Sequence, residues 1–158
     1  MHPCQARAGQ LGQTARMSKT PTSKITRYTV RVEFGDCDPA GIVFFPNYSR
    51  WMDAATHEHF RQCGVPAWHD IPELPGCVGG PLLETHTHFH TSATYGQTLE
   101  VQTQVTEWRG KVFRMAHRIL RDGTLVCEGK ELRALCVKLP DGRLKAVDIP
   151  DFLRERCA

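Results

Sequence analysis

Two carboxylates separated by one residue lie in a segment of turn-forming residues. Asp36 and Asp38 belong to the stretch 35–41, GDCDPAG, in which Pro39 directly follows Asp38. An Asp-Pro pair commonly initiates a turn in which the carboxylate accepts backbone N–H groups, and proline suits the first position of a helical turn. A purely structural role therefore competes with a catalytic role for these residues.

A carboxylate beside exposed backbone N–H groups is suited to attack on a thioester. Negative charge builds on the carbonyl oxygen during such an attack, and the N–H groups can stabilise that charge. Because a thiolate leaves without much help from an acid, one carboxylate acting as nucleophile or as base for water would suffice. The loop that precedes Asn47 could supply both the carboxylate and the donor.

A strand and a long helix are predicted on either side of this segment. Apolar and polar residues alternate from Tyr28 to Phe34, which is typical of a half-buried strand. Asn47 is suited to cap a helix and Gly64 to end it. The apolar face of that helix is predicted to carry Tyr48, Trp51, Met52, Ala55 and His59.

Four further strands are predicted after an irregular loop at 65–81 that is crowded with proline and glycine. Turn residues separate these strands at 95–97, 109–111 and 122–123, and Asp122-Gly123 is typical of a type I′ hairpin. We expect the strands to form an antiparallel meander. They are predicted at Leu82 to Tyr95, Thr98 to Trp108, Val112 to Leu120 and Thr124 to Val137.

One strand, one long helix and four consecutive strands pack most simply as an antiparallel sheet wrapped around a single helix. This is the α+β arrangement of the hotdog fold. Because one helix covers only one face of such a sheet and leaves its edges open, a homodimer or a dimer of dimers is expected.

The chain of 158 residues is predicted to hold one domain, at 27–158, preceded by a disordered basic leader at 1–26. Its hydroxyl-rich, acid-free composition resembles that of an organellar transit peptide, although Met17 could equally be the true start and we favour a dispensable tail. No apolar run reaches the roughly 18 residues of a membrane-spanning helix, so we expect no membrane partner.

Charge and cysteine usage exclude further classes of function. Residues 1–27 carry five basic and no acidic side chains, and the remainder has a net charge of −2, unlike a domain that grips nucleic acid. The seven cysteines form no Cys-x-x-Cys pair and suggest neither a disulfide framework nor a zinc knuckle. A cytoplasmic location is therefore expected.

Several segments closely resemble the bacterial 4-hydroxybenzoyl-CoA thioesterases, which are tetrameric hotdog enzymes. The likeness is carried by 32–43 (VEFGDCDPAGIV), 46–48 (PNY) and 50–55 (RWMDAA), and it continues through 63–66 (CGVP) to Phe113. It implies an enzyme that hydrolyses an aromatic acyl-CoA without a metal or other cofactor, as a homodimer or homotetramer.

The resemblance also implies roles for individual residues. Asp38 matches the aspartate that attacks the thioester or activates water there, and Phe45 matches the position whose backbone N–H polarises the carbonyl. Asp53 matches the aspartate that receives the substrate's phenolic hydroxyl across the subunit interface. Arg109 and Lys111 match the basic cluster that holds the nucleotide of CoA.

The chain departs from the family pattern beside the expected acyl pocket. It has Phe44-Phe45 in place of Trp-Tyr, Gly80 in place of Thr, and Gly110 in place of a second Arg. The role of Phe45 survives because it belongs to the main chain, whereas changes at Phe44 and Gly80 leave the acyl group open. The Tol-Pal-associated acyl-CoA thioesterases share part of the motif but usually carry a His where this chain has Pro46.

Three alternatives remain open: a thioesterase for short aliphatic acyl groups, an acyl-CoA sensor without hydrolysis, and a dehydratase of the same fold. Asp38 argues against the sensor, and the dehydratase spacing of Asp and His is not found at 39–43.

Histidines and a cysteine offer other chemistry that we consider less suited to this chain. His86, His88 and His90 alternate on one strand face, but no carboxylate or cysteine is placed to complete a zinc site, so we expect no metal. His59 is expected to be a satisfied core histidine. Cys37 lies between two aspartates, which disfavour its thiolate.

Overall fold

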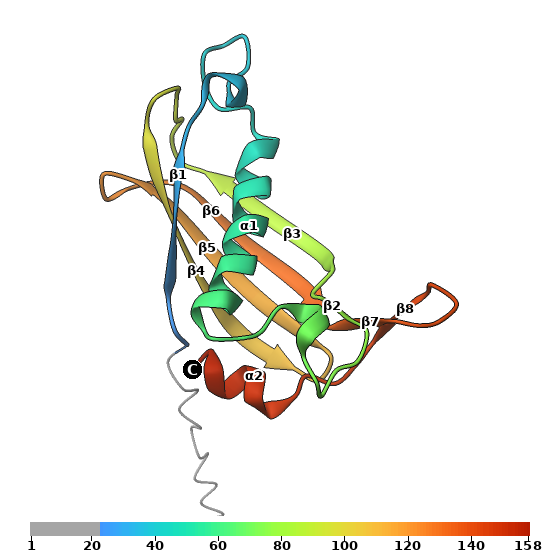
Figure 1. Cartoon of the computed structure of the whole chain (residues 1–158). Coiled ribbons are helices and arrows are strands. Elements are labelled where there is room, and N and C mark those ends of the chain that lie inside the picture. The colour runs from blue at the N-terminus through green and yellow to red at the C-terminus, as the bar shows by residue number, and fades with distance from the viewer. Residues whose placement is uncertain (1–22) are drawn as a thin grey trace, which may run out of the picture.

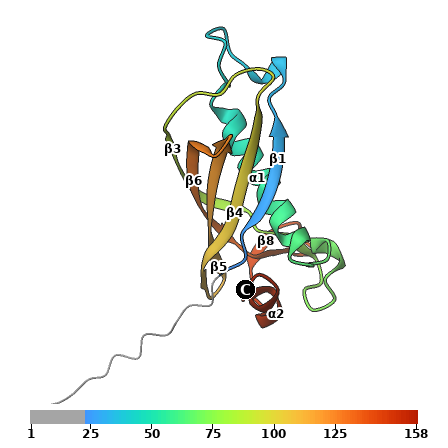
Figure 2. The ribbon, with the colours of Figure 1, turned by 90° about the vertical axis from the view of Figure 1, so that its left-hand side faces the viewer.

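A five-stranded antiparallel sheet curves around one long helix in the computed structural model, which describes residues 23–158. The strands lie in the order β1-β4-β5-β6-β3, and α1 packs against one face of the sheet (Figure 1 and Figure 2). The expected α+β hotdog arrangement is confirmed. The strands are β1 (Thr26–Arg31), β3 (Leu82–Phe89), β4 (Thr98–Arg109), β5 (Val112–Arg121) and β6 (Thr124–Ala134), and the helix is α1 (Pro46–Gln62).

Smaller elements close the lower end of the molecule in Figure 1. A second sheet has the order β2-β7-β8, and the C-terminal helix α2 lies below β1 and α1. These elements are β2 (Cys77–Gly79), β7 (Cys136–Lys138), β8 (Leu144–Ala146) and α2 (Asp151–Arg156), with 3-10 turns η1 (Phe34–Asp36) and η2 (Trp68–Asp70). None of the helices within residues 23–158 combines the length and apolar character needed to cross a bilayer.

The first strand is shorter than its alternating pattern predicted. β1 ends at Arg31, and Phe34 is 80% exposed in η1 instead of facing the core. The Asp36 carboxylate accepts the Glu33 N–H at 2.9 Å, so this local bond ends the strand and forms a turn. The predicted leader at 1–26 lies mostly outside the described residues, of which Ser23 is the first.

The predicted N-cap of the helix is wrong by two residues. Phe45 is the N-cap, and Pro46 occupies the first helical position, where its missing N–H costs no hydrogen bond. The Asn47 side chain instead donates to the Asp36 carbonyl at 2.9 Å. The C-terminal end was predicted correctly, since Gly64 follows the helix with a φ of +74°.

The strand order corrects the predicted meander. β4, β5 and β6 are consecutive hairpin neighbours, but β3 pairs with β6 and not with β4. β1 occupies the edge of β4 instead, so residues 90–97 form a crossing connection rather than a hairpin. The type I′ turn at 122–123 is confirmed by the positive φ values of Asp122 and Gly123.

The core lies between α1 and the concave face of the sheet. All five residues predicted for the apolar face of α1 are buried. The Met52 side chain of α1 packs directly on Gly129 of β6, where an added Cβ would lie 2.4 Å from its sulfur. Glycine at this position therefore leaves room for the Met52 side chain.

Candidate active site

The loop between β1 and α1 is held in place by Asp36. Its buried carboxylate receives Arg50 Nη2 at 2.7 Å, and its carbonyl receives the Phe44 N–H at 2.8 Å. Contacts with the 90–97 connection add to these bonds: the Val43 N–H donates to the Ala93 carbonyl, and Thr94 Oγ1 donates to the Gly41 carbonyl. Asp36 is thus the structural member of the carboxylate pair.

Asp38 is the carboxylate that remains open to solvent. Its Oδ1 accepts the Ala40 N–H at 2.8 Å, and no other hydrogen bond to this carboxylate is found within residues 23–158. Its own N–H donates to the Ile42 carbonyl, and Gly41 turns the chain with a φ of +75°. One side of the carboxylate is therefore fixed by the turn while the other is free to meet a substrate.

Phe45 presents its backbone N–H at the start of α1. Among the described residues this group donates to no acceptor, whereas the neighbouring N–H groups of Phe44 and Asn47 are paired. The positive end of the helix dipole adds to its attraction for an anion. Asp38 and Phe45 thus belong to the same tightly tied loop.

A surface pocket of about 260 Å³ opens next to this loop. The ring of Phe45 lines it, together with that of Tyr48, whose pKa is raised by burial. Phe89 of β3 packs against Tyr48 at a centroid distance of 5.4 Å. The full lining is Ile42, Val43, Phe45, Tyr48, Phe89, His90, Thr91 and Ser92.

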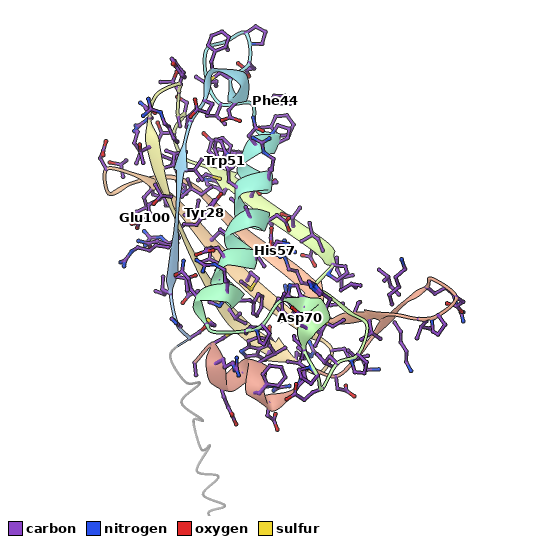
Figure 3. The ribbon with its side chains drawn as sticks, viewed as in Figure 1. Tyr28, Phe44, Trp51, His57, Asp70 and Glu100 are labelled. Atoms are coloured by element: carbon purple, nitrogen blue, oxygen red, sulfur yellow. The ribbon has the colours of Figure 1, made fainter. Side chains whose placement is uncertain are left out.

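Phe44 lies outside this pocket. Its ring packs edge-on against Phe45 at a centroid distance of 5.3 Å, and about half of its surface is exposed. Figure 3 shows Phe44 beside the first turn of α1, at the outer end of the helix. Phe44 and Phe45 were both predicted to line the acyl pocket. Within one chain, Phe45 lines this pocket and Phe44 does not.

Asp53 lies two turns further along α1 and forms an ion pair with Arg133 of β6. Arg133 Nη2 donates to Asp53 Oδ1 at 2.7 Å, and Nη1 of the same guanidinium donates to the Gly80 carbonyl at 3.0 Å. One buried arginine therefore joins two of the predicted substrate-binding residues. The Asp53 carboxylate itself remains 54% exposed.

Arg133 belongs to a chain of polar groups beneath the helix. Its Nε donates to Glu131 Oε2 at 2.8 Å, and His117 Nε2 lies 3.3 Å from the same oxygen without being aligned for a hydrogen bond. His117 Nδ1 meets Thr103 Oγ1 at 3.0 Å. Burial alone would raise the pKa of Glu131, but its interactions with His117 and Arg133 outweigh burial and lower it to about 2.

The pKa of Arg133 is correspondingly raised. Burial by itself would lower it, but the bonds to Glu131 and then Asp53 outweigh that effect. The guanidinium is thus a permanent cation under Asp53. Sequence reasoning missed Arg133, although the alternation of β6 carries a signal: Cys127 and Gly129 face inward, and the same phase continues to Glu131 and Arg133.

Arg109 and Lys111 lie at the other end of the sheet from Asp38. The end of β1 that leads to Asp38 pairs at Arg31 with Thr98, whereas Arg109 ends β4 eleven residues further on. At about 3.3 Å per residue this separation is about 36 Å. Both cations are exposed. A single chain therefore does not bring the predicted CoA-binding residues to the predicted catalytic loop.

The other candidates behave as structural residues. His86, His88 and His90 lie on the exposed edge strand β3 or just beyond it, and His90 lies 3.4 Å from Glu128. His59 is buried with Thr26 as partner, in agreement with its predicted core role. Cys37 is half-buried and packs against the core beneath the loop.

Comparison with known proteins agrees with this fold. The model of the thioesterase-like superfamily matches residues 32–157. The chain is 41% identical over 134 residues to the 4-hydroxybenzoyl-CoA thioesterase of Pseudomonas sp. (strain CBS-3), covering 81% of this chain and 94% of that protein. Its fold matches an aspartate-to-asparagine mutant of 4-hydroxybenzoyl-CoA thioesterase, solved with 4-hydroxybenzoyl-CoA, at a TM-score of 0.79 and 37% identity, covering 85% of this chain and 99% of that one.

A second solved structure, a gentisyl-coenzyme A thioesterase, matches at a TM-score of 0.73 and 30% identity, covering 84% of this chain and 100% of that one. An antiparallel sheet around one helix, with these relatives, defines a thioester hydrolase of the hotdog fold. The chain belongs to the thioesterase-like superfamily, within the group of the 4-hydroxybenzoyl-CoA thioesterases.

Proposed function

We propose that this enzyme hydrolyses 4-hydroxybenzoyl-CoA to 4-hydroxybenzoate and CoA. The observation that carries the proposal is the loop that ties Asp38 and the Phe45 N–H together at the start of α1. The 41% identity to a thioesterase named for this substrate supports the choice of acyl group. We further propose a cytoplasmic location, which the free state of all six described cysteines supports.

Asp38 is the group proposed to act on the thioester. Either its free carboxylate oxygen attacks the carbonyl carbon, giving a mixed anhydride that water then hydrolyses, or it takes a proton from a water that attacks directly. In both routes the C–S bond breaks, the thiolate of CoA leaves, and the Phe45 N–H stabilises the oxyanion. The chain's own residues supply every group in this scheme, so no metal or cofactor is invoked.

Asp53 is proposed to recognise the phenolic hydroxyl of the substrate. An ionised carboxylate accepts a hydroxyl proton in a charge-assisted hydrogen bond. The guanidinium of Arg133 holds this carboxylate from one side at 2.7 Å, and Asp53 keeps about half of its surface open to a ligand. The Gly80 carbonyl accepts a hydrogen bond from the same guanidinium. We therefore propose that Gly80 borders the acyl group.

Assembly into a homodimer or homotetramer is proposed to complete the site. β3 is an edge strand with its unpaired side open, and Leu82, Leu83 and Phe89 on it are large exposed apolar residues. Pairing of two β3 edges would cover them. Asp53 would then face a substrate bound at the partner's loop, and Arg109 and Lys111 would hold the CoA nucleotide of another chain.

The test is thiol release from 4-hydroxybenzoyl-CoA, benzoyl-CoA and hexanoyl-CoA by the purified protein and by Asp38→Asn. We expect preference for the hydroxylated aryl thioester and a loss of at least about a hundredfold in the variant, with unchanged thermal unfolding. Preference for hexanoyl-CoA would keep the mechanism and replace the substrate by a short aliphatic acyl-CoA. Binding of all three without hydrolysis would leave an acyl-CoA sensor instead.

A further inference from the structure

A second cluster of chemically active side chains lies at the far end of α1 from the Asp38 loop. His59 of α1, Cys63 just after the helix and Cys157 just after α2 place their ligating atoms within 4.8 Å of one another. All three are buried, with exposed fractions of 0%, 7% and 0%. His59 lies thirteen residues beyond Pro46, a distance of about 20 Å along the helix, so the cluster is separate from the proposed active site.

The hydrogen bonds of Thr26 indicate which nitrogen of His59 carries the proton of the neutral ring. Thr26 Oγ1 lies 3.3 Å from the Thr103 carbonyl, an acceptor to which only the hydroxyl can donate. Having one proton, Thr26 must then accept from His59 Nδ1, which lies 2.8 Å away. The proton of the neutral imidazole is therefore on Nδ1, and the lone pair of Nε2 points to Cys63 Sγ at 3.7 Å.

This spacing suits a metal ion held between the two atoms. Zinc binds sulfur at about 2.3 Å and imidazole nitrogen at about 2.0–2.1 Å, and a tetrahedral angle between those bonds separates the ligand atoms by about 3.6 Å. The Thr26 hydroxyl supplies the outer hydrogen bond that orients ligating histidines in metal sites. The ring is thus already held in the direction of a metal ligand.

Charge also favours a divalent ion. Two cysteine thiolates and a neutral imidazole carry a charge of −2 together, which Zn²⁺ cancels, so the buried complex has no net charge to desolvate. Thiolate and imidazole are the ligands that zinc takes in proteins.

We propose that His59, Cys63 and Cys157 form a structural site for Zn²⁺ that connects the end of α1 to the residue that follows α2. Binding converts both thiols to thiolates and releases two protons to solvent. The described residues supply three ligands of the four that a structural zinc site takes. This proposal departs from the expectation of no metal that the sequence alone supported, because Cys157 lies 94 positions beyond Cys63 in the chain.

The experiment uses the full chain, treated with a chelator and kept reduced, and titrated with Co²⁺ and with Zn²⁺. We expect one equivalent of Co²⁺ to give thiolate-to-cobalt charge-transfer absorption, Zn²⁺ to displace it, and Zn²⁺ to raise the melting temperature by several degrees. Cys157→Ser should lose the absorption and the rise in melting temperature. Cys77→Ser, which removes another buried thiol, should keep both.

We expect the metal-free Cys157→Ser protein to keep the far-UV circular dichroism and cooperative thermal unfolding of the metal-free wild type, so that its loss of metal binding could not be ascribed to unfolding. Failure of the wild type to bind Co²⁺ or Zn²⁺ would overturn the proposal. Equal binding by Cys157→Ser would overturn it as well.

Discussion

Arg133 Nη2 lies 2.7 Å from Asp53 Oδ1. This contact connects a buried side chain of the sheet to the residue proposed to bind the phenolic hydroxyl of the substrate. Arg133 is buried in β6, whereas Asp53 is on the exposed side of α1. The same arginine therefore bonds to Asp53 on the helix and to the buried Glu131 of the sheet. Mutation of Asp53 should therefore change substrate recognition, whereas mutation of Arg133 should change the free energy of unfolding.

Replacing Asp53 by Asn should impair only hydroxylated aryl substrates. The amide oxygen still accepts from Arg133, but the negative charge is gone, and loss of a charge-assisted hydrogen bond of about 1.5–3 kcal/mol lowers kcat/KM by roughly 10- to 100-fold. Thiol release from 4-hydroxybenzoyl-CoA and benzoyl-CoA measures this difference. Equal losses on the two substrates would rule out phenol recognition by Asp53.

Replacing Arg133 by Met should destabilise the protein by about 3–5 kcal/mol, because Glu131 remains buried without its cation. Arg133→Lys should lie between this variant and the wild type, since one ammonium cannot reach Glu131, Asp53 and the Gly80 carbonyl together. Urea denaturation measures the free energies of unfolding. A change below about 0.5 kcal/mol in Arg133→Met would show that the network contributes no stability.

The carboxyl of Glu131 should make stability sensitive to acid. Its pKa is 4.5 ordinarily and about 2 in the folded protein, so its contribution is present in full above pH 4.5 and is lost as the pH falls through 2. The linked free energy is about 3 kcal/mol. The unfolding free energies of wild type and Glu131→Gln should converge between pH 5 and pH 2, and a constant difference over that range would refute the linkage.

Replacing Arg50 by Ala should lower turnover more than stability. Arg50 is mostly exposed, but its bond to Asp36 holds the loop that carries Asp38 and the Phe45 N–H. Because a displacement of about 1 Å can cost up to a hundredfold, we expect kcat to fall by roughly tenfold. The matched control is Arg61→Ala, which removes an exposed ion pair to Glu58 elsewhere on α1 and should leave kcat unchanged.

Local patterns predicted the buried face of α1, which followed from its helical spacing. The turn motif singled out Asp38 as a candidate carboxylate, whereas the role of Phe45 was predicted only from the resemblance to the 4-hydroxybenzoyl-CoA thioesterases. Phe34 and Asn47 were misplaced because the Asp36 carboxylate and carbonyl take the N–H of Glu33 and the amide of Asn47, contacts that periodicity does not describe.

Features set by distant pairing could not be read in the same way. The place of β3 at the β6 edge depends on β1 having taken the edge of β4, and the Arg133–Asp53 pair joins residues 80 positions apart. The alternation of β6 is consistent with an inward-facing Arg133, but it does not indicate that the partner of Arg133 is Asp53 of α1.

Ser23 and Lys24 lie next to Cys157, and this proximity determines how the enzyme can be engineered and immobilised. Ser23 Oγ and the Lys24 N–H both donate to the Cys157 carbonyl, at 3.1 and 2.9 Å. Figure 1 shows this junction at the opposite end of the molecule from the loop that follows β1. A short peptide could join the two positions in a circular permutant whose new ends lie at the exposed Asp122-Gly123 turn. Attachment to a solid support through the C-terminal end would likewise leave the Asp38 loop facing the solution.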